Sequence, residues 1–291
     1  MDINYELYKV FYHVAVTLSF SEASKQLFIS QSAVSQSIKV LEKKLSQKLF
    51  IRSTKRVQLT PEGEILFKHI QPAMNLIKQG EHQLLESGSL GGGQLRIGAS
   101  DTICRYFLVP YLKQFHQNHP HVHIKVTNQT SIQCAALLEH GQVDCIVVNS
   151  PNSALNSSHI TRTINEFHDV FVANRQYFPL EHQCISLKEL QKKPILMLER
   201  KSTTSEFLHS VFQRLHLDLV PEIELSSNDL LIDLARIGLG IAFVPDFCIP
   251  KDDRDLFELK LKEELPARQI VAAYNEKLPL SQTAKQFMEM L

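Results

Sequence analysis

The sequence predicts an α+β protein of several domains: an N-terminal winged helix-turn-helix, a long connecting helix and a C-terminal α/β domain. Three observations lead to this prediction. Residues 21–49 read as two helices joined by a tight turn. Residues 61–88 repeat apolar side chains at helical spacing. Beyond residue 93 the pattern changes to strands that alternate with helices.

Length and composition agree with a multidomain globular protein. The chain has 291 residues, of which 44% are hydrophobic and 21% are charged. No window approaches the roughly 18 uninterrupted apolar residues of a membrane span. Asp2, Asn4 and Glu6 interrupt the N-terminus, so it does not read as a signal peptide. We therefore expect a cytoplasmic protein with no membrane partner.

The N-terminal residues predict three helices that share a core. Over residues 4–18, apolar side chains recur at steps of four, three and four, as Leu7, Phe11, Val14 and Leu18. Residues 31–45 keep the same spacing with Val34, Ile38, Leu41 and Leu45. This spacing places side chains along one face of a helix. We expect the first helix to pack its apolar face on the helix-turn-helix pair.

The opposite face of the third helix is polar and basic, with Ser32, Ser35, Gln36, Lys39 and Lys43. Such side chains can hydrogen-bond base edges and phosphates when a helix lies in the major groove of DNA. Ser30 is placed to cap this helix, so the amides that follow it, near Gln31, are polarised toward a phosphate. This face is the candidate DNA-binding surface.

Charge supports a nucleic-acid partner. Residues 21–60 contain eight Lys or Arg and two Glu, whereas the formal charge of the whole chain is zero. Within this segment, residues 49–52 and 56–59 predict a short β-hairpin with its tip at 53–55. A hairpin beside a helix-turn-helix is a wing. We expect Arg52, Lys55 or Arg56 to contact backbone phosphate, the alternative for each being a solvated basic side chain.

Thr60, Pro61 and Glu62 begin a long predicted helix with an N-cap, a proline in the first helical position and an acid in the first turn. A heptad pattern follows at Leu66, Ile70, Ala73, Ile77, Gly80 and Leu84. A monomer would expose this pattern, so we expect a homodimer through the helix; packing on its own domain is the alternative. Pro72 and Gly80 predict a bend or a local break.

A glycine-rich segment at 87–93 predicts a flexible hinge. Two sets of strands and helices follow, and we expect two lobes. The first set comprises strands at 94–98, 122–126 and 145–148 and helices at 105–118 and 132–140. The second comprises strands at 170–173, 195–198, 222–225 and 241–244 and helices at 205–216 and 229–237. A last strand and helix are expected at 269–274 and 281–290.

Polar loops follow several strands of the predicted sheets. They contain Ser100, Asp101, Thr102, Thr130, Ser131, Asn149, Ser150, Ser202, Thr203, Thr204 and Asn228. In open α/β sheets, ligands bind beyond the carboxyl ends of the strands, where helices begin. We expect a small polar or anionic effector there, although each residue could equally be only a helix N-cap. Asp101 argues against a simple carboxylate, and Arg200 and Lys201 argue for one.

Residues 20–63 resemble the DNA-binding end of LysR-type transcriptional regulators. The match runs from Phe20 through the segment ISQSAVSQSI at 29–38 to Thr60-Pro61-Glu62-Gly63 without gaps. The sequence departs from the family pattern at Ser32, where proline is frequent, and at Gln36, where arginine is frequent. Both residues lie on the expected base-reading face, so the departures concern which operator is read.

The resemblance implies an organisation and a function. The DNA-binding domain would span 1–60, the dimerisation helix 61–88 and the effector domain 89–291. The effector domain would be similar to periplasmic binding proteins, with lobe I at about 94–163 and 266–291 and lobe II at about 164–265. The effector contacts would be Ser100, Asp101, Thr102, Thr130, Asn149, Ser202, Thr203 and Asn228. A dimer of dimers bound to a dyad operator and controlled by the effector is the expected assembly.

The sequence gives weaker support for an enzyme or for a metal- or redox-responsive regulator. We find no nucleophile elbow, zinc-protease motif or phosphate loop, so we expect neither an enzyme nor a bound cofactor. A metal-responsive regulator stays open because His116, His119, His121 and His123 lie close together. A redox-responsive regulator stays open because five free thiols are expected, at Cys104, Cys134, Cys145, Cys184 and Cys248.

Overall fold

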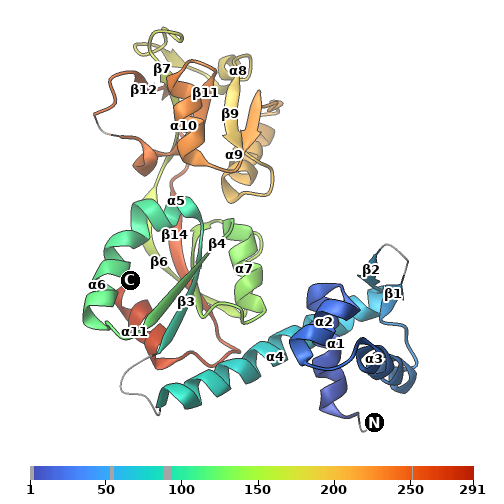
Figure 1. Ribbon diagram of the computed structural model, residues 1–291. Helices are drawn as coiled ribbons and strands as arrows, with labels where there is room; N and C mark the ends of the chain where they lie inside the picture. The colour runs from blue at the N-terminus through green and yellow to red at the C-terminus, as the bar shows by residue number, and fades with distance from the viewer. Residues whose placement is uncertain (1–2, 53–55, 88–92, 251) are drawn as a thin grey trace. The chain divides into compact units, whose positions relative to one another are not determined.

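The computed structural model describes residues 3–52, 56–87, 93–250 and 252–291 (Figure 1). The chain divides into two compact units, the first comprising residues 1–88 and 140–142 and the second residues 89–139 and 143–291. Over the described residues, no helix combines the length and the apolar character needed to cross a bilayer.

The first unit begins with three helices, α1 (Tyr5–Thr17), α2 (Phe20–Leu27) and α3 (Gln31–Leu45). Their shared core contains Phe11, Val14, Val34, Ile38 and Leu41, all fully buried. The predicted apolar faces are therefore confirmed, with one correction. Leu18 is half exposed because α1 ends there, with Leu18 in the left-handed region at φ 47°.

The wing is a two-stranded antiparallel hairpin of β1 (Phe50–Arg52) and β2 (Val57–Leu59), and its predicted tip lies outside the described residues. A buried carboxylate on α3 fixes the start of this hairpin. Glu42 Oε1 accepts hydrogen bonds from the amides of Leu49 and Phe50, at 2.9 and 3.4 Å. The wing is thus tied to the helix whose outer face carries the candidate DNA contacts.

Helix α4 (Pro61–Ser87) starts as predicted, because Thr60 Oγ1 accepts a hydrogen bond from the Gly63 amide at 2.9 Å. The predicted local break is wrong: the helix continues through Pro72. Leu66 and Ile70 pack on the core of the first unit, whereas Ile77 and Leu84 are 56% and 78% exposed. The first part of the heptad pattern therefore serves its own domain, and the second part is left uncovered in this chain.

Replacing Gly63 by Ala is expected to destabilise the first unit by about 1–3 kcal/mol, as overpacking typically does. An added Cβ would lie 2.2 Å from the Leu49 carbonyl oxygen, where the start of the wing meets α4. Gly80→Ala is the matched control, because a Cβ at Gly80 meets nothing within 4 Å. That change should stabilise the helix by about 0.5–1 kcal/mol. Urea unfolding followed by circular dichroism measures both, and equal effects would contradict the steric argument.

The second unit contains two five-stranded sheets (Figure 1). The first has the order β4-β3-β5-β14-β6. Its strands are β3 (Gln94–Ala99), β4 (His123–Asn128), β5 (Cys145–Ser150), β6 (His159–Phe167) and β14 (Arg268–Asn275). Its helices are α5 (Asp101–Ile103), a π-helical turn η1 (Cys104–Leu108), α6 (Val109–Asn118), α7 (Ser131–Glu139) and α11 (Gln282–Met290). The C-terminal strand thus returns to the first lobe, as the family resemblance implied.

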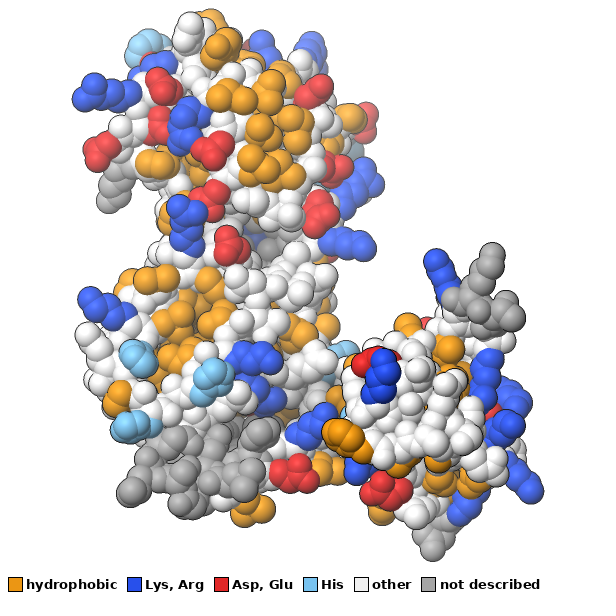
Figure 2. Space-filling model, viewed as in Figure 1, with side chains coloured by type: hydrophobic (Ala, Val, Ile, Leu, Met, Phe, Trp, Pro, Cys, Tyr) orange, Lys and Arg blue, Asp and Glu red, His pale blue; other side chains and the backbone are white. Residues whose placement is uncertain are grey.

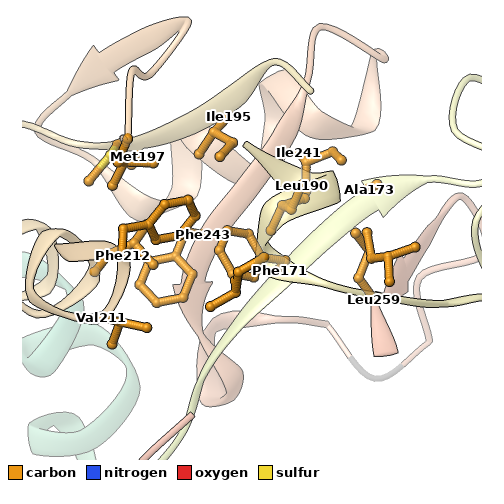
Figure 3. Packing of buried hydrophobic residues seen from close by; sticks show 14 of the residues in the cluster. Phe171, Ala173, Leu190, Ile195, Met197, Val211, Phe212, Ile241, Phe243 and Leu259 are labelled. Carbon is orange, nitrogen blue, oxygen red and sulfur yellow. The ribbon is translucent and has the colours of Figure 1, made fainter. Parts of the chain in front are cut away.

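The second sheet has the order β10-β9-β11-β7-β12. Its strands are β7 (Asp169–Asn174), β9 (Ile195–Leu198), β10 (Ile223–Leu225), β11 (Ile241–Pro245) and β12 (Leu256–Glu258). Its main helices are α9 (Thr203–Arg214) and α10 (Asn228–Arg236). Figure 3 shows part of its core, where Phe171, Phe212 and Phe243 pack with Ile195 and Met197.

Several short elements lie outside the sequence prediction. They are β8 (Cys184–Ile185), α8 (Leu187–Leu190), η2 (Asp246–Cys248) and β13 (Lys260–Leu261). Strand β6 was also missed, and it keeps the chain in the first sheet to Phe167, beyond the expected lobe boundary at 163. The helix expected at 105–118 begins at Asp101 instead, which brings its N-terminus to the end of β3.

Candidate functional site

The outer face of α3 presents the predicted polar side chains to solvent. Ser30, Gln31, Ser32, Gln36, Lys39 and Lys43 are exposed, and Ser35 is half-buried. Ser30 caps the helix, since its Oγ accepts a hydrogen bond from the Ala33 amide at 3.2 Å. Lys and Arg side chains gather along the side of the first unit that α3 occupies (Figure 2). The buried and exposed faces of α3 are those that the sequence predicted, and DNA binding by the exposed face stays a prediction.

The wing residue Arg52 is held against the start of the helix-turn-helix. Its guanidinium lies 4.3 Å from the ring centroid of Phe20, and Nη1 donates a hydrogen bond to Ser35 Oγ at 3.4 Å. These contacts preorganise an exposed cation beside the outer face of α3. Arg56 is exposed at the start of β2, and Lys55 lies outside the described residues.

A polar cavity of about 440 Å³ in the second unit brings together all eight predicted effector contacts. They lie near the carboxyl ends of β3, β4, β5, β9 and β10, at the last residues of a strand, in the following loop or at the start of the next helix. The cavity also has lining residues that the sequence reasoning did not select, namely Asn128, Gln129, Gln133, Leu198, Glu199, Ser226 and Ser227. Asn128 and Gln129 were missed because the strand was expected to end at Val126. Ser150, in contrast, is not among the lining residues.

Helix N-termini converge on this cavity, from α7, α9, α10 and the helical stretch that begins with α5. Their caps are already used inside the protein: Ser100, Ser202 and Ser227 accept hydrogen bonds from Ile103, Ser205 and Leu230 amides at 3.1–3.3 Å. The N-cap alternative therefore holds for the hydroxyls of Ser100 and Ser202, and also for Thr130, whose Oγ1 accepts a hydrogen bond from the Gln133 amide at 3.3 Å. Aligned amide dipoles nevertheless make the cavity favourable for negative charge.

Two amide side chains in the cavity wall each have an oxygen that lacks a hydrogen-bond partner in the described part of the chain. Asn149 and Asn228 are buried, and the Oδ1 atom of each has no hydrogen-bond partner within the described part of the chain. A buried carbonyl oxygen without a partner costs free energy. Both oxygens can therefore accept hydrogen bonds from hydroxyl or ammonium groups of a ligand.

Charged side chains around the cavity differ from the expectation. Asp101 and Glu199 line it, and Asn128 Nδ2 donates a hydrogen bond to Asp101 Oδ1 at 3.4 Å. Arg200 and Lys201 are exposed and are not part of the lining, in which no Lys or Arg occurs among the described residues. The cavity wall therefore combines helix amides, which favour an anionic group, with carboxylates, which favour hydrogen-bond donors.

Both lobes contribute to the cavity and contact each other beside it. Asn228 Nδ2 donates a hydrogen bond to Thr102 Oγ1 at 2.9 Å. Tyr106, on the helix that begins at Asp101, donates from its hydroxyl to Asp229 Oδ1 at 2.5 Å, and Arg105 pairs with the same carboxylate at 3.2 Å. We call Arg105, Tyr106 and Asp229 the interlobe clasp.

Tyr106→Phe is expected to lower the melting temperature of the second unit by about 1–4 °C, because one hydrogen bond between the lobes is lost. Burial and the Asp229 bond raise the pKa of Tyr106 to about 12. The bond should thus stabilise the fold below pH 10 and be lost as the pH rises through about 12. Tyr111→Phe is the control, since the Tyr111 hydroxyl has no hydrogen bond to any described residue. Equal melting temperatures for Tyr106→Phe and the parent would contradict the clasp.

A buried ion pair joins the two sheets where the chain crosses between them. Arg268, the first residue of β14, donates from Nη1 to Asp169 Oδ2 at 2.7 Å, and both side chains are fully buried. The same nitrogen donates to Thr204 Oγ1 at 3.1 Å, and Thr204 lines the cavity. The Phe167 and Phe207 rings lie 5.4 and 5.1 Å from the guanidinium. This pair was not predicted, because no local pattern marks it.

The histidines and cysteines of the metal-responsive and redox-responsive alternatives differ in their exposure to solvent. His116, His121 and His123 are exposed, and His119 packs on the Phe115 ring. Within the described ranges, no group of three or more His, Cys, Asp or Glu side chains is arranged to hold a metal. Cys184 is exposed, whereas the other thiols are buried or half-buried, and burial raises the pKa of Cys104 to about 11 and that of Cys134 to about 12. Such thiols resist conversion to the reactive thiolate.

Comparison with known protein families matches nearly the whole chain. Residues 5–64 match the model of bacterial regulatory helix-turn-helix proteins of the lysR family. Residues 88–291 match the LysR substrate binding domain. Both matches agree with the resemblance seen in the sequence.

Several relatives of this chain are named as transcriptional regulators, and solved structures share its fold. A probable RuBisCO transcriptional regulator of Cyanidioschyzon merolae is 28% identical over 267 residues, covering 88% of this chain and 85% of that protein. The transcriptional activator CmpR of Synechocystis is 28% identical over 237 residues, covering 81% of this chain and 77% of that protein. A full-length OxyR variant from Pseudomonas aeruginosa shares the fold at 19% identity, with a TM-score of 0.72 and coverage of 100% and 95%.

Two further structures contain a partner or ligand. Full-length CbnR complexed with its target DNA has a TM-score of 0.68 at 16% identity, covering 99% of this chain and 98% of that one. The regulatory domain of Synechocystis CcmR in complex with 2-PG has a TM-score of 0.62 at 22% identity, covering 68% of this chain and 94% of that one. At these identities the likeness shows the fold alone.

Proposed function

This chain belongs to the LysR family of transcriptional regulators, and we propose that it binds a dyad operator under the control of a small polar effector held between its two lobes. The family consists of DNA-binding regulators and not enzymes. We propose that it acts in the cytoplasm, because a DNA-binding regulator must reach its operator. The observation that carries the proposal is the cavity that joins all eight predicted contacts with several helix N-termini.

The DNA-binding part of the proposal uses α3 and the wing. The side chains proposed to contact DNA are Ser30, Gln31, Ser32, Ser35, Gln36, Lys39, Lys43, Arg52, Lys55 and Arg56. Exposure of Gln36 and Lys39 on α3 supports major-groove binding, and the position of Arg52 supports a phosphate contact. A dyad operator requires a dimer, which we assign to the exposed part of α4 around Ile77 and Leu84. A tetramer would pair two such dimers.

The effector part of the proposal follows from the chemistry of the cavity wall. The effector contacts are proposed to be Ser100, Asp101, Thr102, Thr130, Asn149, Ser202, Thr203 and Asn228. Helix amides favour an anionic group, whereas Asn149 Oδ1, Asn228 Oδ1 and the Asp101 carboxylate favour hydroxyl or ammonium donors. We therefore propose a small metabolite that carries both. Binding would shift the population between arrangements of the lobes, by no more than the ligand's differential affinity allows.

A thermal-shift screen of the full-length protein against polar metabolites tests the effector proposal, with 2-PG as the first probe because CcmR is seen in complex with it. Asn149→Leu removes an unsatisfied oxygen, so it should preserve stability while abolishing the ligand-induced shift. Asn165→Leu, at an exposed position of β6, should keep the shift. If Asn149→Leu and the parent respond equally to a ligand, the cavity is not the effector site.

Genomic footprinting of the purified protein tests the operator proposal. We expect protected sites with dyad symmetry, and the genes beside them would indicate the pathway that supplies the effector. Footprints on one such site should then change at saturating effector. Binding to all DNA alike at low ionic strength would reduce the proposal to electrostatic attraction.

A further inference from the structure

The turn between α2 and α3 carries an aromatic side chain that the fold does not use. Phe28 is 94% exposed and belongs to none of the hydrophobic clusters formed by the described residues. It ends α2 in the left-handed region at φ 54° and donates its amide to the Lys25 carbonyl. Glycine or asparagine suits such a position, and a bulky side chain is disfavoured there. Phe28 therefore contributes neither packing nor a favourable backbone conformation.

The position of Phe28 suggests what covers it. Phe28 lies two residues before Ser30, the N-cap of α3, and Gln31 and Ser32 beside it are also exposed. The start of a recognition helix is the end that approaches bases and phosphates. Apolar side chains at this end can contact a thymine methyl group or the deoxyribose edge.

We propose that Phe28 is a DNA contact of this protein, with its ring against a thymine methyl or a deoxyribose beside the α3 contacts. The proposal rests on the proposed DNA-binding function and adds an uncharged contact to it. A contact of this kind adds affinity without releasing counterions, unlike the contacts of Lys39 or Arg52.

A second copy of the chain is a less suitable occupant. The exposed apolar surface here consists of Phe28 and its neighbour Ile29, which is 41% exposed. One aromatic ring buries about 150–250 Å². A stable protein interface buries roughly 1,200–2,000 Å². The exposed residues that flank the pair in the chain are polar, with Lys25 and Gln26 before it and Ser30, Gln31 and Ser32 after it, and such side chains hydrogen-bond DNA.

The test compares Phe28→Asn and Phe28→Tyr with the full-length parent. The probe is a duplex selected by the parent from a random double-stranded library, and binding is followed by fluorescence anisotropy over a range of salt. For Phe28→Asn we expect about tenfold weaker binding, a melting temperature equal to or above that of the parent, and an unchanged slope of log K against log salt. Phe28→Tyr keeps the ring and should bind within about twofold of the parent. Tyr5→Asn, which removes another exposed ring of the first unit, should leave affinity unchanged.

Each outcome of this test supports or overturns the proposed contact between Phe28 and DNA. Unchanged affinity of Phe28→Asn for a duplex that the parent binds overturns this inference and leaves the proposed function intact. A fall in melting temperature or an altered oligomeric state by sedimentation shows instead that Phe28 serves the fold or a second copy. Failure of the parent to select any duplex overturns the proposed function together with this inference.

Discussion

Arg268→Met is expected to destabilise the second unit by about 3–5 kcal/mol, because it leaves the Asp169 carboxylate buried without its cation. Asp169 is fully buried, and its Oδ1 already has no partner among the described residues. The lost hydrogen bond to Thr204 should also displace the start of α9 and weaken effector binding. Urea unfolding of the variant and the parent measures the loss of stability.

The pH dependence of Arg268→Met follows from the same pair. Burial raises the pKa of Asp169, and Arg268 counteracts that rise. Removing the cation should raise the pKa of Asp169 further in the folded state. The buried carboxyl then costs less free energy in its neutral, protonated form than in its charged form. The free energy of unfolding of the variant should therefore recover as the pH falls from 8 toward 5.

A double variant separates the loss of charge balance from the loss of packing. Asp169→Leu combined with Arg268→Met replaces the whole pair by apolar side chains between Phe167 and Phe207. Such replacements are often neutral or stabilising, so most of the lost stability should return. If the single variant loses less than about 1 kcal/mol, the pair does not stabilise the second unit. If the double variant is no more stable than the single one, the loss comes from the packing of Arg268 and its Thr204 bond and not from an unpaired charge.

Local patterns in the sequence predicted most of the secondary structure. Steps of three and four placed the faces of α1 and α3 correctly, because a buried stripe is a local signal. The edge strand β6 was missed because most of its residues are exposed on both faces, so no buried alternation marks it. Pro72 and Gly80 were expected to bend or locally break α4; the break is wrong, because the helix continues around the missing amide donor of Pro72.

The candidate site was predictable only in part, for a physical reason. The polar loops after the strands predicted the position of the cavity, because strand ends in such sheets meet at one edge. The clasp between Tyr106 and Asp229 and the pair of Arg268 with Asp169 join residues about a hundred positions apart. No periodicity reports such long-range contacts. The exposed ring of Phe28 was likewise invisible before the backbone of the turn was known.

Replacing Gln36 and Lys39 together by Ala is expected to weaken binding to a selected duplex about 100-fold. An amide that reads a base edge contributes roughly 1–3 kcal/mol, and a lysine at a phosphate adds a salt-dependent contribution. The slope of log K against log salt should fall by about 2 for a dimer, one phosphate contact per protomer. Fluorescence anisotropy over a range of salt measures both quantities.

Lys9→Ala is the matched control, because Lys9 is an exposed cation of α1 that pairs with Glu6 at 3.7 Å and lies on another helix. It removes one charge per protomer, as Lys39→Ala does, so long-range attraction changes equally in both. Its affinity should stay within about threefold of the parent, with the same salt slope. If the control and the α3 variant lost affinity alike, the interaction would depend on net charge, and α3 would not be the element that enters the groove.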